Sequence, residues 1–141
     1  MLRRFFIAIL GLTMIAALLG VCGCSSGTGA LEGTHWRLES WTLNSLNPAD
    51  FTITAQFAGG QISGNSGVNS YGGPVKLGPG AAFSAGPLTS TLMAGPEPAM
   101  RAESAFTKLL AGATSYKVSS GTLTLYDGGG NESLVFAAVR K

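Results

Sequence analysis

The sequence is short of the residues that most often carry out chemistry. Its 141 residues include two cysteines, both before residue 25, and a single histidine, His35. A domain without cysteine beyond residue 24 has no internal disulfide and no thiolate metal site. One histidine among abundant serines does not indicate a catalytic triad, because chance proximity explains it as well. We therefore predict no catalytic residue, no metal ligand and no cofactor.

Charge is also scarce, at 11% of the residues. The chain has nine basic and seven acidic residues, but Arg3 and Arg4 lie in the N-terminal segment. Without these two, seven basic residues stand against seven acidic ones, and the net charge is about zero. Nucleic-acid binding normally needs a clustered positive surface, so we expect no nucleic-acid partner.

The N-terminal segment has the pattern of an export signal. Arg3 and Arg4 are followed by an apolar run of 17 residues, from Phe5 to Val21. A run of this length lies between the core of a secretory signal and a full membrane span. It ends at small residues and cysteine rather than at charged or aromatic residues, which favours a cleaved signal. An uncleaved membrane anchor is the alternative.

Cys24 ends the segment Val21-Cys22-Gly23-Cys24, which resembles the lipobox of bacterial lipoproteins. In those proteins the cysteine after the cleavage site carries the lipid and becomes the first residue of the mature chain. Cys24 is the predicted attachment site because the small residue Gly23 precedes it, whereas cleavage before Cys22 would follow Val21. Two or more acyl chains on one residue give stable membrane attachment.

This resemblance divides the chain into three segments. Residues 1–23 are expected to be removed as a lipoprotein signal peptide. Residues 24–30, rich in serine and glycine, are expected to form a flexible tether. Residues 31–141 are expected to form one domain, which is large enough to bury a core of its own. The protein would then be exported to the bacterial cell envelope and held in the inner or the outer membrane through the lipid on Cys24.

Short alternating segments separated by glycine turns indicate a mainly β domain. Residues 34–41 and 51–57 alternate apolar and polar side chains with the period of two that half-buried strands show. Towards the C-terminus, residues 116–118, 122–126 and 133–139 are separated by Ser-Ser-Gly and Asp-Gly turns. Short turns join antiparallel neighbours, so the predicted sheet is a meander.

One segment, from Pro98 to Ala111, has helical spacing instead. Proline suits its first turn, and Gly112 stands where a glycine cap would end it. We expect one helix, packed across an end or an open side of the sheet. Glu97 and Glu103 are interpreted as complementing the helix dipole, because six residues apart they do not face one another for shared acid–base chemistry.

A motif between the hairpins carries a second resemblance. Residues 64–73 read Gly-Asn-Ser-Gly-Val-Asn-Ser-Tyr-Gly-Gly, residues 91–95 read Thr-Leu-Met-Ala-Gly, and Glu-Ser-Ala-Phe follows at 103–106. Together with the preceding tryptophan strand, this order resembles the META domain over roughly residues 31–139. The resemblance implies a small antiparallel meander β-barrel of lipocalin-like architecture with one helix packed on it. It implies an envelope or stress-response association and no catalytic mechanism, so we expect that the protein is not an enzyme.

The sequence departs from the META pattern at two positions. Val68 and Gly95 stand where members of the family often have cysteine. Because both cysteines are replaced together, the resemblance implies that these two positions touch in the fold, with ordinary packing in place of a disulfide.

Two interpretations of the motif loop remain open. Asn65, Asn69 and Tyr71 form a candidate recognition loop. The alternative is a tight polar turn in which glycines take positive φ and Asn69 bonds to local backbone.

Two functions are likewise open. The first is a non-enzymatic, membrane-anchored envelope lipoprotein with an interaction or stress-response role, whose partner is an unidentified envelope protein. The second is the binding of a small apolar molecule inside the barrel or beneath the helix. Seven aromatic residues of the domain would line such a cavity, or else fill the core of a small barrel; they are Trp36, Trp41, Phe51, Phe57, Phe83, Phe106 and Phe136.

Overall fold

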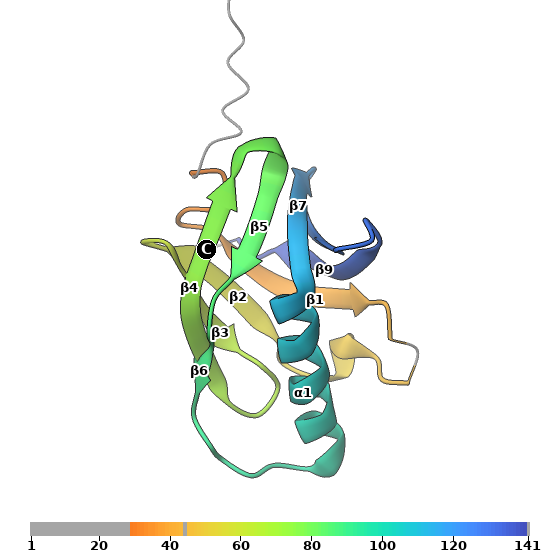
Figure 1. The fold of residues 1–141 in the computed structure, drawn as a ribbon. Helices are drawn as coiled ribbons and strands as arrows, with labels where there is room; N and C mark the ends of the chain where they lie inside the picture. The colour runs from red at the N-terminus through yellow and green to blue at the C-terminus, as the bar shows by residue number, and fades with distance from the viewer. Residues whose placement is uncertain (1–28, 44, 141) are drawn as a thin grey trace, which may run out of the picture.

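The chain folds into an antiparallel sheet that closes on itself, with one long helix at its side (Figure 1). The computed structural model describes residues 29–43 and 45–140. The predicted signal peptide 1–23, Cys24 and most of the predicted tether 24–30 lie outside the described residues. Within the described part, no helix combines the length and the apolar character that a membrane crossing requires.

The elements follow one another along the chain with short connections. They are β1 (His35–Trp41), the short helix η1 (Pro48–Asp50), β2 (Thr54–Ala58), β3 (Gln61–Asn65), β4 (Ser70–Gly78), the short helix η2 (Pro79–Ala81), β5 (Ala82–Ala85), β6 (Thr89–Ser90), α1 (Glu97–Gly112), β7 (Ala113–Ser119), β8 (Thr122–Asp127) and β9 (Glu132–Ala138).

Eight of these strands form a closed barrel. Their order is β3-β2-β1-β9-β8-β7-β5-β4, and β4 pairs with β3 to complete the ring. All of these pairs are antiparallel. Strands that are consecutive in the chain pair from β1 to β5 and from β7 to β9. Strand β5 pairs with β7, although β6 and α1 lie between them in the chain, and β9 pairs with β1. The short strand β6 pairs with β4 beyond the end of β5. The predicted meander and the barrel with one helix are both confirmed.

Because neighbouring strands alternate in direction, their ends gather at the two ends of the barrel. Residues 29–34 cross one end, where Leu31 is completely buried and the N–H of Gly33 donates to the carbonyl of Phe57 (2.8 Å). The β2–β3, β4–β5 and β7–β8 connections lie at this same end, called here the Leu31 end. The β3–β4 loop, which contains Asn69, and the start of α1 lie at the opposite end, the Asn69 end (Figure 1).

Aromatic rings fill the barrel interior. Phe83 makes edge-on contacts with Phe57 and Tyr116, with ring centroids 6.5 Å apart in both pairs. Phe106 makes edge-on contacts with Tyr71 at 5.3 Å and with Phe136 at 6.4 Å. Edge-on geometry is the favoured arrangement of neighbouring rings. The buried aromatic residues of the interior therefore pack on one another.

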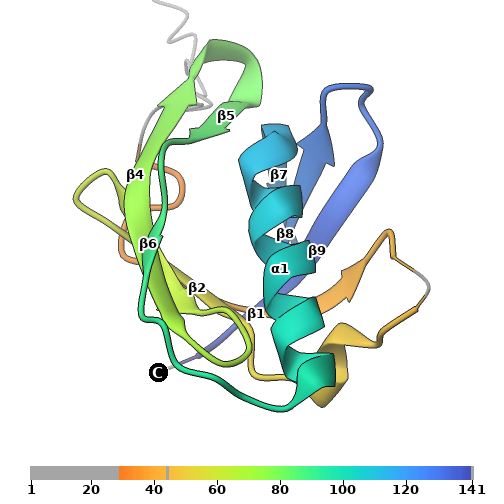
Figure 2. The same cartoon turned by 60° about the horizontal axis from the view of Figure 1, so that its bottom comes forward.

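Helix α1 packs against the barrel beside its weakest pairing, and the one packed helix expected from the sequence is present. Only the pair Ala82–Ser115 joins β5 to β7, and α1 lies beside this weak seam (Figure 2). Its residues Ala102, Phe106 and Leu110, each four apart, form the buried stripe. The predicted glycine cap is wrong: Gly112 is the last helical residue, and Ala113 caps the helix in an extended conformation. The chain passes directly from the helix into β7, which requires an extended residue rather than a left-handed one.

The interpretation of residues 64–73 as one loop is also wrong in its extent. Gly64 and Asn65 end β3, residues 70–73 begin β4, and only residues 66–69 connect the two strands. Sequence patterning missed β4, β5 and β6 altogether. Glycine, proline and exposed small residues dominate these strands, so they lack the apolar alternation that predicts a strand.

Removing the Phe106 ring should destabilise the whole fold, because this ring of α1 packs against Tyr71 of β4 and Phe136 of β9. We expect Phe106→Ala to lower the free energy of unfolding by about 3–5 kcal/mol, the usual cost of deleting a buried phenyl ring. The control is Val139→Ala, at a side chain that is 49% exposed. Urea unfolding followed by near-UV circular dichroism measures both, and equal losses in the two variants would contradict this account of the core.

Candidate functional site

The META motif residues meet around the side chain of Asn69, which is 3% exposed. Its Oδ1 accepts hydrogen bonds from the hydroxyl of Thr91 (2.8 Å) and the backbone N–H of Met93 (2.7 Å). Its Nδ2 donates to the carbonyl of Met93 (3.1 Å) and to Oε2 of Glu103 (2.8 Å). An asparagine side chain offers two donors and two acceptor positions, so every one of them is used inside the protein.

Glu103 reaches this cluster from the second turn of α1. Its Oε1 accepts the backbone N–H of Asn69 (3.0 Å) and the hydroxyl of Ser66, which is completely buried. Burial alone raises the pKa of the Glu103 carboxyl, but hydrogen bonds from Ser66 and Asn69 outweigh burial and hold that pKa below its ordinary value. We call the set Ser66, Asn69, Thr91, Met93 and Glu103 the Asn69 network.

Tyr71 extends the motif into the core. Its ring packs edge-on against Phe106, and its hydroxyl donates to the carbonyl of Thr54 (2.9 Å). Burial raises the pKa of the Tyr71 hydroxyl above its ordinary value. The backbone of Gly64 also passes close to Thr54, since a Cβ atom on Gly64 would lie 2.2 Å from the carbonyl oxygen of Thr54. A motif glycine is therefore required here by the close approach of β2.

The three residues of the candidate recognition loop thus occupy different environments. Asn69 and Tyr71 are buried, and their polar atoms bind other parts of the chain. Asn65 is partly exposed, and its Oδ1 accepts the N–H of Gly67 (2.9 Å), which has a φ of 123°. These bonds match the tight polar turn. A recognition role for this loop stays a prediction.

The Asn69 network holds a segment that carries two exposed apolar side chains. Leu92 is 95% exposed and Met93 is 58% exposed. Their backbone is fixed on both sides, because the N–H of Thr91 donates to the carbonyl of Ser70 (3.1 Å) and Asn69 holds both backbone groups of Met93. We call this pair the Leu92–Met93 tip. Sequence patterning did not identify it, since only tertiary contacts reveal which side of a loop faces solvent.

Val68 and Gly95 touch, as the META resemblance implied. A Cβ atom on Gly95 would lie 2.7 Å from Cγ2 of Val68 and 3.4 Å from its Cβ. The Cβ atoms of a disulfide are about 3.5–4.5 Å apart, so the two positions have nearly the spacing of a bridged pair. Valine against glycine fills the same space with ordinary packing.

Other candidate groups are not assembled into a site. His35 lies at the Leu31 end and lines two surface grooves, neither of which contains a serine or carboxylate side chain among the described residues. In residues 29–43 and 45–140, no three histidine, aspartate or glutamate side chains come together as metal ligands would. Glu97 is exposed, and its Oε1 lies 3.8 Å from Nε of Arg101 in an ion pair. The helix-dipole interpretation suits Glu97, but it missed the role of Glu103.

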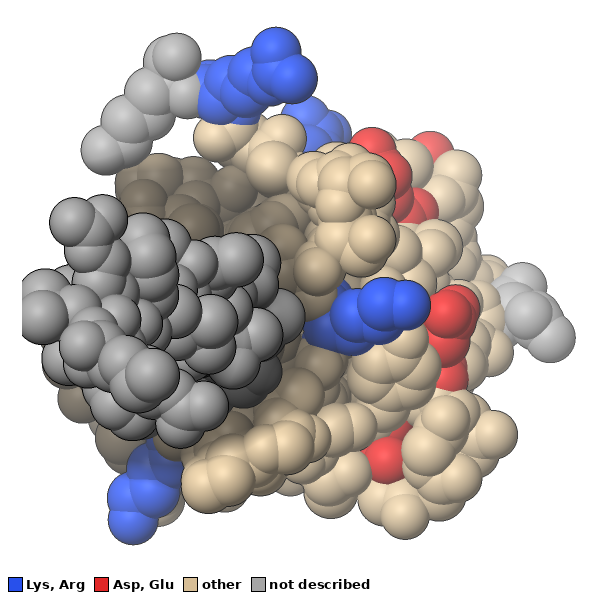
Figure 3. All heavy atoms as spheres, turned by 90° about the horizontal axis from the view of Figure 1, so that it is seen from above, with Lys and Arg blue, Asp and Glu red and all other residues tan. Residues whose placement is uncertain are grey.

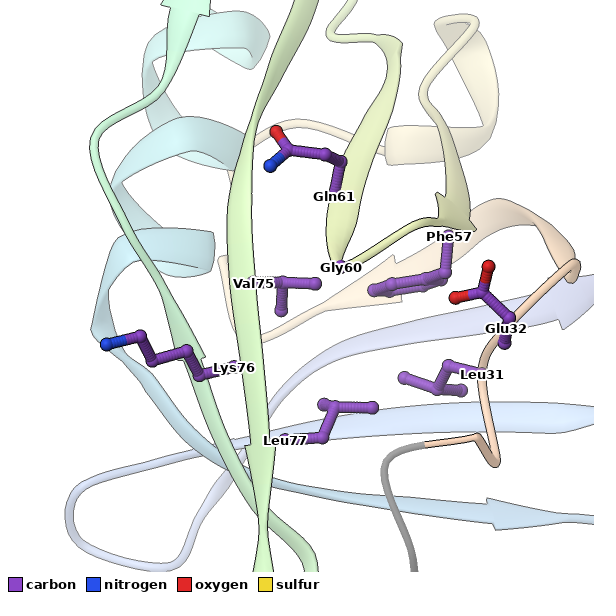
Figure 4. A pocket seen from close by; sticks show the side chains of 8 residues that line it. All are labelled: Leu31, Glu32, Phe57, Gly60, Gln61, Val75, Lys76 and Leu77. Atoms are coloured by element: carbon purple, nitrogen blue, oxygen red, sulfur yellow. The ribbon is translucent and has the colours of Figure 1, made fainter.

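Two further grooves on the surface have apolar linings. One, of about 330 Å³, lies at the Leu31 end, where Leu31, Phe57, Val75 and Leu77 point towards one another (Figure 4). The other, of about 510 Å³, runs beside α1, and we call it the α1 groove. Its lining residues are Leu43, Ala105, Lys108, Leu109, Gly112, Asp127 and Ser133.

Comparison with known proteins places this geometry in a family. A family model described as META domain matches residues 29–140. An NMR structure of a protein from Burkholderia xenovorans superposes with a TM-score of 0.67 at 26% identity, over 83% of this chain and 88% of that one. No curated protein sequence matches.

Two more distant structures share the fold. A second protein solved by NMR superposes with a TM-score of 0.58 at 19% identity, over 76% of this chain and 90% of that one. The crystal structure of a DUF4847 family protein from Bacteroides vulgatus gives a TM-score of 0.59 at 14% identity, over 82% of this chain and 99% of that one.

The lowered pKa of Glu103 predicts a specific pH dependence. A carboxyl with a lower pKa in the folded state stabilises the protein fully above its unfolded pKa, and this contribution disappears as the pH falls through the folded pKa. We expect Glu103→Gln to cost about 1–3 kcal/mol at neutral pH and to lose part of the acid dependence. Glu97→Gln, at an exposed ion pair, is the control. Urea unfolding across an acid series measures both variants, and an unchanged pH profile in Glu103→Gln would contradict the network.

Cysteines at the two META positions should form a disulfide. We expect Val68→Cys/Gly95→Cys, made with Cys22→Ser and Cys24→Ser, to oxidise without loss of fold and to gain about 3 kcal/mol of stability. Val68→Cys alone is the control. Mass spectrometry after thiol alkylation gives the readout, and two free thiols in the folded, air-oxidised double variant would show that the positions are further apart than described.

Proposed function

The chain belongs to the META domain family, and from that premise we propose that it is a non-enzymatic, lipid-anchored protein of the bacterial cell envelope. In this proposal it acts by binding an envelope protein through the Leu92–Met93 tip. The stress-response association that the family resemblance implies is part of the same proposal.

The Leu92–Met93 tip is the observation that carries the proposal. Exposing a leucine forgoes about 1.5–3 kcal/mol of burial, and here the side chain is 95% exposed. The N–H of Thr91 donates to the carbonyl of Ser70, and the N–H of Met93 donates to the side chain of Asn69, so the backbone of the segment is held in place before any partner arrives. A segment whose backbone is already held loses less conformational entropy on binding, which helps a small contact to become a binding hot spot.

The position of the tip agrees with a lipid anchor on Cys24. Six residues lie between Cys24 and Leu31, and the seven Cα–Cα steps of such a chain, fully extended, span at most about 25 Å. The lipid would therefore lie close to the Leu31 end. The tip lies at the Asn69 end, which is the end of the barrel further from this attachment point.

A structural role for the motif supports the non-enzymatic part of the proposal. The polar atoms of Asn69 and the hydroxyl of Tyr71 are engaged within the chain. The Glu103 carboxylate accepts hydrogen bonds from Ser66 and Asn69. Side chains with these bonds stabilise a loop and are poorly placed to exchange protons with a substrate.

The α1 groove favours a second candidate function, the binding of a small apolar molecule. Rings occupy the barrel interior, so such a ligand would bind beside α1 against Leu43, Ala105 and Leu109. Native mass spectrometry of the protein tests this with Leu109→Asp as the variant and Leu92→Asp as the control. A co-purified small molecule lost only in Leu109→Asp supports the ligand, and its absence from the unaltered protein counts against it.

The anchor is tested by metabolic labelling with an alkyne analogue of palmitate. We expect the unaltered protein to carry the label and to fractionate with membranes, and Cys24→Ala to lose the label. Cys22→Ala is the matched control and should keep it. Labelling that persists in Cys24→Ala, or no labelling of the unaltered protein, would remove the lipid anchor from the proposal.

The tip is tested by placing a photo-crosslinking amino acid at position 92 in cells. We expect one discrete crosslinked envelope protein at this position and none at Ser120, an exposed turn residue at the Leu31 end. Purified partner should then bind the unaltered protein at least about tenfold more tightly than Leu92→Asp, the size expected for a hot spot. Equal binding by Leu92→Asp would rule out the tip as the contact.

A further inference from the structure

We propose that the Leu31 end of the barrel rests on the surface of an anionic lipid bilayer. This inference depends on the proposed anchor at Cys24 for the membrane, but the contact surface is argued from the described residues alone. It assigns a second, lipid-facing surface to the protein, opposite the Leu92–Met93 tip.

Two apolar grooves flank residues 30–34 where they cross the Leu31 end. On one side, Val75 and Leu77 of β4 surround Leu31 and Phe57 (Figure 4). On the other side is a groove of about 370 Å³, lined by residues that include Val118 and Val139. These two valines are 43% and 49% exposed, although both are large apolar side chains. Leu31 and Phe57 are buried, so the accessible apolar side chains of this rim are the half-buried Val75 and Leu77 on one side and Val118 and Val139 on the other.

Positive charge is concentrated at the same end. Lys76 lines the β4 groove, Lys117 precedes Val118, and Arg140 follows Val139. Figure 3 looks down on this end: Lys and Arg side chains extend from its margin on more than one side, and Asp and Glu side chains are visible along one side of the same view. The acidic residue Glu32 also lies here, and its Oε1 accepts the N–H of Gly59 (2.7 Å).

Acidic residues lie mainly towards the opposite end. They are Glu39 in the second half of β1, Asp50 in η1, Glu97 and Glu103 in α1, Asp127 at the end of β8, and Glu132 at the start of β9. The domain is thus polarised although its net charge is about zero. Near an anionic leaflet each lysine or arginine strengthens binding by about fivefold, so this polarity favours contact through the Leu31 end.

The short connection to Cys24 makes even a weak contact effective. A tether of a few residues keeps the domain at a millimolar effective concentration near the surface, so docking needs little affinity of its own. Exposed apolar side chains ringed by lysine and arginine are the usual composition of a membrane-surface contact. Beside the Leu92–Met93 tip, by contrast, Arg101 is paired with Glu97, and the helix start is acidic.

The test uses the processed full-length protein, reconstituted into phosphatidylcholine vesicles with or without phosphatidylglycerol. Val118→Cys and Leu92→Cys each carry an environment-sensitive dye, and nitroxide-labelled lipid is the quencher. We expect strong quenching at position 118 that requires phosphatidylglycerol and falls at high salt, and little quenching at position 92. Equal quenching at the two positions, or quenching at 118 that ignores lipid charge, overturns the proposal.

Charge reversal provides the matched control. Lys76→Glu/Lys117→Glu should weaken the phosphatidylglycerol-dependent quenching at position 118 at least about tenfold. Arg101→Glu/Lys108→Glu makes the same change in net charge on α1 and should leave it intact. Equal effects of the two double variants would mean that net charge, not the Leu31 end, controls the contact.

The outcome separates docking from anchoring. A protein that does not float with the vesicles overturns both proposals. A protein that floats but shows equal quenching at the two positions overturns docking alone. If palmitate labelling is negative and the protein still floats through an uncleaved leader, quenching at position 118 continues to support docking.

Discussion

The structure of the Asn69 end depends on the hydrogen bonds that the carboxylate of Glu103 requires. A charged group lifted partly out of water must find hydrogen-bond donors, and here the donors are the hydroxyl of Ser66 and two N–H groups of Asn69. Asn69 in turn binds Met93, so one helix residue fixes both the β3–β4 loop and the chain that leads into the helix. Removing any one donor leaves this charge less fully compensated, which explains why these residues belong to one motif although they are far apart in sequence.

The same arrangement links the helix to the barrel and to the tip. Three residues beyond Glu103, Phe106 lies on the same helical face and packs between Tyr71 and Phe136. The polar and aromatic contacts of α1 therefore secure the seam that a single pair between β5 and β7 leaves weak. The backbone of the Leu92–Met93 tip is held through the same contacts, because Asn69 binds both Glu103 and Met93. In the proposed function, the Asn69 end presents this tip to a protein partner, and in the further inference the opposite, Leu31 end rests on the membrane.

Local signals in the sequence predicted the terminal hairpins and α1, because their apolar spacing is regular. They missed β4 to β6, whose glycines and prolines form strands only because neighbouring strands supply the hydrogen bonds. Glu103 was interpreted as a helix-dipole residue, since nothing local shows that Asn69, 34 positions earlier, lies beside it. The contact of Val68 with Gly95 was available only from the META resemblance, and the exposure of Leu92 only from the folded chain.

Native-state hydrogen exchange at the backbone N–H groups of Asn69 and Met93 tests the central claim most directly. These groups donate to Glu103 and to the side chain of Asn69, not to a neighbouring strand. If the network fixes the loop and the tip, both amides should exchange only through global unfolding, with the same protection as amides in the β8–β9 pairing. Fast exchange of either amide, while the β8–β9 amides stay protected, would show that the loop opens independently and that the Asn69 network does not hold the tip.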